Sequence, residues 1–213
     1  MHIIHRGIVS KKYKENLLSS FKQSFKRGHG VETDIHITKD GKFICYHDFT
    51  LSRIFNKNKS IKNLSYLQIK KVCAKTKRPI PLLKDLLNTS KNKFFIFIEI
   101  KPYLSKSHLK KLLKETSKFN NCVFISFKHE NIYNLLKIKR NINVGLSFAT
   151  RSKIKTITNK SKNNYIKYLI LDKSFIRNKS IQKLKIKKYF YTIKTKAEFK
   201  KYKNYNNLIF ENL

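Results

Sequence analysis

Residues 31–47 read VETDIHITKDGKFICYH, and this stretch decides how the strands of the chain are counted. Val31–Thr38 and Lys42–Tyr46 both have strand composition, and the Asp40-Gly41 pair between them is a strong hairpin signal. We therefore predict two antiparallel strands here. The return arm, Lys42–Tyr46, pairs with the strand before it and is not counted among the strands of a parallel sheet.

Eight strands remain once that arm is set aside, and most are followed by a Lys-rich segment of helical period. Besides Val31–Thr38 they are His2–His5, Phe94–Ile100, Cys122–Ser126, Val144–Ser147, Tyr168–Leu171, Tyr189–Ile193 and Leu208–Phe210. This alternation predicts an α/β fold, a short (β/α)8 TIM barrel with a β-hairpin extending from strand 2. A doubly wound open sheet is the alternative, although no GxGxxG follows the first strand.

Amphipathic periodicity predicts the helices, and no repeat or linker divides the chain. The whole of residues 1–213 is therefore expected to form a single domain. The helices expected are Glu15–Arg27, Leu64–Val72, Leu82–Leu87, Lys106–Thr116, Asn131–Lys137 and Lys196–Tyr202.

Cysteine usage and hydropathy indicate a soluble protein of a reducing compartment. Three widely spaced cysteines without a CxxC pair argue against a disulfide framework or a zinc ribbon. No run approaches the roughly 18 apolar residues of a membrane span. The first residues, MHIIHR, lack the basic start and long apolar stretch of a signal peptide. We expect a cytoplasmic location and no transmembrane segment.

The charge is extreme: 49 Lys and Arg against 12 Asp and Glu give a formal net charge of +37 at pH 7. Such an excess favours anionic partners, whether nucleic acid, an acidic membrane surface or a phosphorylated small molecule. The basic residues are nearly all Lys, spread along the whole chain and accompanied by many Asn and Ile. This mixture is typical of an AT-rich genome, and no RNA- or DNA-binding motif accompanies it. We expect a small anionic substrate and no specific nucleic acid partner.

Polar residues gather where the predicted strands end, which is where barrel enzymes have their active sites. The first strand ends in His5-Arg6-Gly7. The second carries Glu32, Asp34 and His36 at alternate positions, so these three side chains share one face. The third ends with Glu99 and Lys101 in phase with Phe95 and Phe97, a face that points into a barrel.

The hairpin register decides where His47 lies. If Asp40-Gly41 forms a two-residue turn, residues whose numbers sum to 81 face each other, and Asp34 lies opposite His47. A three-residue loop with a Gly bulge shifts the pairing by one residue. In both registers the return arm brings His47 over the carboxylates.

This set of residue types indicates phosphoester chemistry. Glu32, Asp34 and Glu99 would repel one another without a cation, and oxygen-only ligands select Mg²⁺ or Ca²⁺. His5 and His47 can serve as a general acid and a general base near neutral pH. Two cationic side chains, Arg6 and Lys101, are suited to phosphate oxygens.

Short segments in the first half of the chain carry a family pattern. They are His5-Arg6-Gly7, Glu15-Asn16, Glu32-x-Asp34 leading into Thr38-Lys39-Asp40-Gly41, His47-Asp48-x-Thr50-Leu51-x-Arg53, Ile80-Pro81-Leu82-Leu83 and Glu99-Ile100-Lys101. In order and spacing the chain resembles the glycerophosphodiester phosphodiesterase family, whose fold is a (β/α)8 barrel. The later half is less similar. Tyr191-Thr192 stands where Trp-Thr is usual. The last strand usually ends in Thr-Asp followed by Pro, but here Phe210 leads into Glu211-Asn212.

The resemblance implies hydrolysis of glycerophosphodiesters to glycerol 3-phosphate and an alcohol, a step of glycerophospholipid degradation. By analogy with the family, one divalent cation binds to the three carboxylates, the two histidines are the acid–base pair, and Arg6 and Lys101 hold the phosphate. Two alternatives remain: a phosphodiesterase of the same fold acting on lysophospholipids, which an exposed apolar lip would favour, and an inactive basic barrel that binds nucleic acid.

Other residues of these motifs have more ordinary expected roles. His36 is expected at the pocket rim, Cys45 in inert packing, and Asp48 and Arg53 in shaping the loop after His47. Glu15-Asn16 should cap the first helix, although Glu15 could also brace Arg6. Two aromatic residues, Phe127 and Tyr191, are core positions by default, with lining of the pocket as the alternative.

Overall fold

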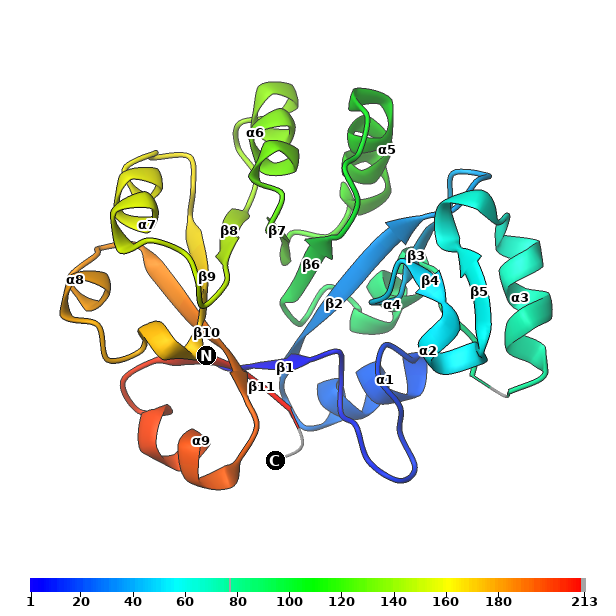
Figure 1. Cartoon of the computed structure of the whole chain (residues 1–213), viewed down its shortest axis with the longest axis horizontal. Helices are drawn as coiled ribbons and strands as arrows, with labels where there is room; N and C mark the ends of the chain where they lie inside the picture. Colours follow the sequence, from blue (N-terminus) through cyan, green and yellow to red (C-terminus); the bar gives the residue numbers. More distant parts are fainter. Residues whose placement is uncertain (77, 212–213) are drawn as a thin grey trace.

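The computed structural model describes residues 1–76 and 78–211. Within them the chain forms a closed barrel of parallel strands with helices around it (Figure 1). The strands follow one another around the ring in chain order, and β1 closes it by pairing with both the second and the last strand. This closure makes the alternative open sheet wrong. The barrel strands are β1 (Ile3–His5), β2 (Gly30–Ile37), β6 (Ile96–Ile100), β7 (Cys122–Ser126), β8 (Val144–Phe148), β9 (Tyr168–Asp172), β10 (Lys187–Ile193) and β11 (Asn207–Phe210).

The helices that cover the barrel are amphipathic, and their apolar faces pack on the outward side chains of the strands. Helical stretches were expected between the later strands, and α7 and α8 are two of them whose bounds were not predicted. The covering helices are α1 (Leu18–Lys26), α4 (Leu83–Ser90), α5 (Lys106–Thr116), α6 (His129–Ile138), α7 (Ile154–Ser161), α8 (Lys179–Gln182) and α9 (Lys196–Tyr202), with 3-10 turns η1 (Ile61–Asn63) and η2 (Lys173–Phe175). A further helix, α3 (Tyr66–Ala74), packs on a separate, smaller core.

The inside of the barrel is filled by alternate residues of the strands. Ile3, Phe97, Val123, Ile125, Tyr168, Ile170, Tyr189 and Ile209 form a separate buried cluster there. Phe97 is fully buried, as its phase with Glu99 predicts. The polar strand ends therefore stand on an apolar floor.

The hairpin has the three-residue loop, so the two-residue turn is wrong. β3 (Phe43–Cys45) pairs with β2 in the register Ile35–Cys45, His36–Ile44 and Ile37–Phe43, whose numbers sum to 80. Gly41 adopts a positive φ of 71°, and the Thr38 N–H donates to the Lys42 carbonyl at 3.0 Å across the loop. Asp34 consequently faces Tyr46, whose N–H donates to the Asp34 carbonyl at 2.9 Å. His47 lies one residue beyond that pair.

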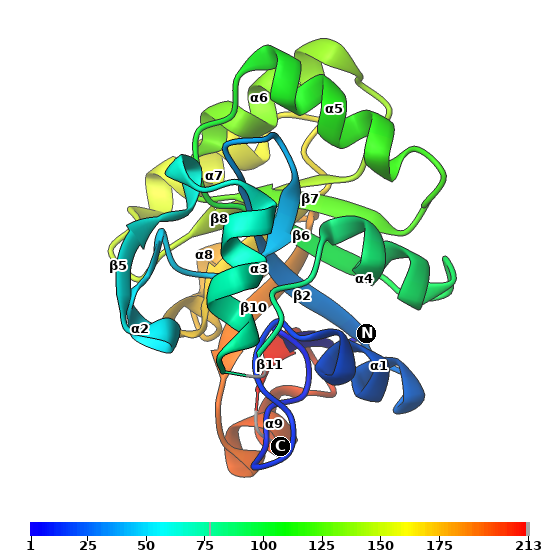
Figure 2. The same cartoon turned by 90° about the vertical axis from the view of Figure 1, so that its right-hand side faces the viewer.

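Between β3 and α4 the chain makes an excursion with a small core of its own. It contains β4 (Thr50–Leu51), α2 (Ser52–Phe55), β5 (Lys57–Ser60), η1 and α3. Its core includes Leu51, Phe55, Ile61 and Ile69. Figures 1 and 2 show these elements together on one side of the barrel, with α3 outermost. Only α3 of this excursion was expected from the sequence, because the strands of the excursion are short and polar.

In the described ranges, no helix combines the length and the apolar character needed to cross a membrane.

Candidate active site

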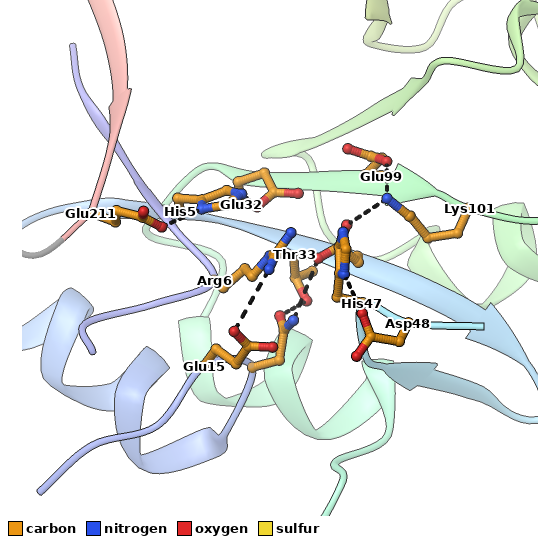
Figure 3. Close-up of polar contacts among 12 residues, drawn as sticks. His5, Arg6, Glu15, Glu32, Thr33, His47, Asp48, Glu99, Lys101 and Glu211 are labelled. Carbon is orange, nitrogen blue, oxygen red and sulfur yellow. Dashed lines mark hydrogen bonds and ion pairs between the residues drawn. The ribbon is translucent and has the colours of Figure 1, made fainter. Parts of the chain in front are cut away.

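Three carboxylates meet at the carboxyl end of the barrel. Glu32 and Asp34 are alternate residues of β2, and Glu99 pairs in register with Asp34 on the neighbouring β6. One oxygen from each lies within 4.8 Å of the others. Glu32 and Asp34 are buried, and the Glu99 side chain is 12% exposed. The cluster predicted from the strand phase is therefore formed, and Figure 3 labels two of its members, Glu32 and Glu99.

Two cations approach the same cluster. Arg6 Nε lies 2.9 Å from Asp34 Oδ2, and Lys101 Nζ lies 2.8 Å from Glu99 Oε1 and 3.3 Å from Asp34 Oδ1. Burial acts to raise the pKa of Asp34, but the two positive charges outweigh burial and lower it. Asp34 is thus held as a carboxylate.

Glu32 and Glu99 are less well compensated. Burial and the charge of Asp34 raise the pKa of Glu32 well above its usual value, and they raise the pKa of Glu99 to about 7. Among the described residues, neither carboxylate oxygen of Glu32 has a hydrogen-bond partner. A buried carboxylate without a partner is costly, and a hard cation with oxygen ligands removes that cost. These residues fit a Mg²⁺ or Ca²⁺ site.

A sharp turn after β1 positions His5 and Arg6. Arg6 and Gly7 have positive φ angles of 56° and 74°, and a Cβ at Gly7 would lie 2.9 Å from Ser20 Cβ. Only glycine fits this turn without strain. His5 Nε2 lies 3.8 Å from Glu32 Oε2, and His5 Nδ1 lies 2.9 Å from Glu211 Oε2.

His47 follows β3 and approaches the cluster from the hairpin. Its Nδ1 lies 2.6 Å from Asp48 Oδ1, and its carbonyl accepts a hydrogen bond of 3.1 Å from His36 Nε2. Burial is the main influence on the pKa of His47 and lowers it, against the opposing effect of Asp34. His36 is 3% exposed and supports the His47 backbone from behind, so its expected place at the pocket rim is wrong.

An ion-pair chain connects these groups. Asp48 Oδ2 accepts from Arg53 Nε at 2.6 Å, Arg53 also contacts Glu15, and Glu15 Oε2 lies 3.6 Å from Arg6. Glu15 thus braces Arg6, which is the alternative role that the sequence suggested for it. The expected helix cap is wrong, because the N-cap position of α1 is Leu17 and makes no side-chain bond.

Asn16 belongs to the same loop and is buried. It accepts a hydrogen bond from Thr33 Oγ1 at 2.8 Å and donates one of 3.5 Å to Asp34 Oδ2. The loop after β1 is thereby tied to β2.

The catalytic candidates surround a cleft of about 500 Å³. Its lining includes both histidines, Glu32, Glu99, Arg6 and Lys101, whereas Asp34 lies beneath. Phe127 and Tyr191 form part of the wall, with ring centroids 5.9 Å apart, so both aromatic residues line the pocket, and Tyr191 also packs against the core of the barrel. The strand ends thus bring the predicted residues to one mouth.

Cys45 is fully buried, and burial raises the pKa of its thiol to about 12, in agreement with inert packing. Glu211 lines the cleft and contacts His5, and it was not among the residues predicted from the sequence. The sequence signalled only a departure from the family pattern at Glu211-Asn212, and Asn212 lies outside the described residues.

Comparison with known proteins places this site in a family. The family model described as "Glycerophosphoryl diester phosphodiesterase family" matches residues 5–207. A glycerophosphodiester phosphodiesterase of Caldanaerobacter subterraneus subsp. tengcongensis is 31% identical over 160 residues, which are 68% of this chain and 65% of that protein's length.

Solved structures share the fold. A glycerophosphodiester phosphodiesterase from Thermotoga maritima has a TM-score of 0.82 at 22% identity, with 98% of this chain and 93% of that chain covered. An Oleispira antarctica phosphodiesterase in complex with the product sn-glycerol-3-phosphate also scores 0.82, at 19% identity over 98% and 91% of the two chains.

Proposed function

The chain belongs to the glycerophosphoryl diester phosphodiesterase family, and we propose that it hydrolyses glycerophosphodiesters to glycerol 3-phosphate and an alcohol. We place this activity in a single domain, residues 1–213. The observation that carries the proposal is the buried carboxylate cluster with an unpartnered Glu32, flanked by two histidines and two cations. The product complex of the Oleispira relative supports the substrate class.

Glu32, Asp34 and Glu99 would hold one divalent cation, Mg²⁺ or Ca²⁺. When bound, such an ion supplies positive charge against the phosphate oxygens and lowers the pKa of an oxygen nucleophile. The chain's own residues do the rest. Arg6 and Lys101 line the pocket beside the carboxylates, and they stabilise the negative charge that grows on the phosphoryl oxygens.

His5 and His47 act as the acid–base pair. One imidazole takes the proton of the attacking oxygen, which belongs either to a glycerol hydroxyl or to water. As the bond from phosphorus to the alcohol oxygen breaks, the other imidazole gives its proton to that oxygen. If the glycerol hydroxyl attacks, a cyclic phosphodiester forms and water opens it in a second cycle. Both histidines line the cleft, as this division of work requires.

The test is release of glycerol 3-phosphate from glycerophosphocholine and glycerophosphoethanolamine by the purified protein. Turnover should be lost in EDTA, return with Mg²⁺ or Ca²⁺, and fall by at least about 100-fold in His47→Ala. His108→Ala, on α5 away from the cleft, is the matched control and should keep full activity. Failure of wild-type protein with both ions and both diesters would refute the proposal.

A second candidate is a diester that carries an acyl chain. The loops after β3, β6 and β7 present exposed aromatic side chains at the mouth, with Phe49 50%, Tyr103 66% and Phe127 42% exposed. Lys128 Nζ lies 4.9 and 4.8 Å from the ring centroids of Phe49 and Tyr103. An exposed apolar surface of this kind favours lysophospholipids as substrates, because it can contact an acyl chain. Faster turnover of lysophosphatidylcholine than of glycerophosphocholine, reduced by Phe49→Ser, would select this candidate. Retention of DNA by the protein without diesterase turnover would instead select the inactive nucleic-acid-binding alternative.

A further inference from the structure

Glu211 occupies the first position after β11 and is fixed there by its backbone. Its N–H donates to the Ile193 carbonyl at 3.0 Å. Because Ile4 and Phe210 are partners in the parallel pair of β1 and β11, His5 and Glu211 are the next residues along on the two strands. Neighbouring strand ends therefore bring the two side chains together at the barrel mouth.

The contact between them is directed at one ring nitrogen. Glu211 Oε2 lies 2.9 Å from His5 Nδ1, while the other nitrogen, Nε2, faces Glu32 at 3.8 Å (Figure 3). The exposed fractions of the His5 and Glu211 side chains are only 17% and 21%. A carboxylate at this distance keeps the ring proton on Nδ1 and restricts rotation of the imidazole.

The second histidine is held in the same way by a different element. His47 Nδ1 lies 2.6 Å from Asp48 Oδ1, on the hairpin side of the mouth. Each histidine of the cleft thus has a carboxylate at Nδ1. Glu211 and Asp48 lie far apart in the sequence. The two histidine–carboxylate contacts are therefore alike in geometry and do not come from a shared sequence motif.

We propose that Glu211 is a positioning residue for His5: it fixes the ring orientation and the Nδ1–H tautomer so that Nε2 exchanges the proton with substrate. In the reaction Nε2 either accepts the proton of the attacking oxygen or donates one to the departing alcohol, and Glu211 itself gains no proton. The inference rests on the proposed function for its kinetic consequence and gives a role to the residue at which the chain departs from its family's pattern.

The kinetic test is a double-mutant cycle. Glu211→Ala should lower kcat by about 10- to 100-fold with little change in KM. In a His5→Ala background the same substitution should change kcat by less than about 2-fold, because its target is gone. Glu211→Gln, whose amide oxygen can still accept a hydrogen bond from Nδ1–H, should recover part of the loss. Glu130→Ala removes an exposed carboxylate in the first turn of α6, and this control should leave kcat unchanged.

Equal losses in the wild-type and His5→Ala backgrounds would show that Glu211 acts independently of His5, and would overturn the proposal. So would full activity of Glu211→Ala.

A second readout does not depend on turnover. In ¹⁵N spectra of the histidine rings above pH 8, His5 should carry its proton on Nδ1 in the wild type and shift toward the Nε2–H form in Glu211→Ala. An unchanged tautomer would overturn the proposal even if the variant is inactive. If the wild type hydrolyses no diester, the proposed function fails, and the ring spectra still decide whether Glu211 orients His5.

Discussion

At the scale of single residues, the site contains buried charged groups that would each lower stability if they stood alone. Some of these charges compensate one another and some do not. Asp34 is held ionised by Arg6 and Lys101, whereas Glu32 has no hydrogen-bond partner in the described part of the chain. Buried, uncompensated charge of this kind lowers stability in exchange for binding strength. The protein should therefore be measurably less stable without a cation.

Without a cation, the contribution of Glu99 to stability should depend on pH. Burial and Asp34 raise its pKa from 4.5 to about 7. Since the folded state holds the proton more tightly, its contribution to stability is complete below pH 4.5 and is lost as pH rises through 7. In EDTA, unfolding free energy should fall over this range by up to about 3 kcal/mol more in the wild type than in Glu99→Gln. Parallel pH profiles in urea unfolding would disprove this reading.

Gly7 offers a second residue-scale prediction. Gly7→Ala puts a Cβ into the Ser20 side chain at a positive φ, so the turn that carries His5 and Arg6 must shift. We expect a loss of about 1–3 kcal/mol in unfolding free energy and of most activity. Gly28→Ala is the matched control: its φ is 76°, but a Cβ there meets nothing within 4 Å. Equal activity of the two variants would contradict the proposed role of the turn.

At the scale of elements, the sequence predicts strands better than connections. Apolar runs set the eight barrel strands, because each must fill one position in a closed ring. The hairpin register could not be decided, since a single extra loop residue changes which residue lies opposite Asp34. Of the excursion after β3 only the helix α3 was predicted, because its strands are polar and short, and its core forms only from residues far apart in the segment.

In the candidate site, too, residues on the strands were predictable, and contacts that depend on barrel closure or on the connecting segments were not. The carboxylates on β2 and β6 were predictable from strand phase alone. The carboxylate partner of His5 was not, because Glu211 meets His5 only through closure of the barrel. Asp48, the neighbour of His47, was expected only to shape its loop, and its contact with Arg53 depends on the fold of the excursion.

Arg53 tests whether the excursion serves catalysis. The excursion begins next to His47, and Arg53 within it contacts both Asp48 and Glu15. Arg53→Met should release Asp48 and lower kcat by about 10-fold, with Tm changed little because the side chain is half exposed. Lys57→Met, on β5 of the same excursion, is the control to assay beside it. A pure loss of Tm with unchanged kcat would reduce Arg53 to a structural role.

At the scale of the whole molecule, the charge of +37 surrounds a cleft that contains both signs. A field of this size draws anions toward the protein and is screened by salt. We predict that raising NaCl from about 10 to 300 mM lowers kcat/KM several-fold more for anionic glycerophosphoglycerol than for zwitterionic glycerophosphocholine. Equal salt dependence for the two diesters would show that the charge has no part in substrate capture.

The most direct measurement of the central claim is the cation dependence of glycerol 3-phosphate release by the wild type and Glu32→Gln, assayed side by side. Glu32→Gln keeps the size of the buried side chain and removes its charge. Wild-type turnover should be absent in EDTA and saturate with Mg²⁺ or Ca²⁺, while Glu32→Gln should require at least about 10-fold more cation or remain inactive. Equal turnover of the two proteins in EDTA would contradict a cation site at these carboxylates.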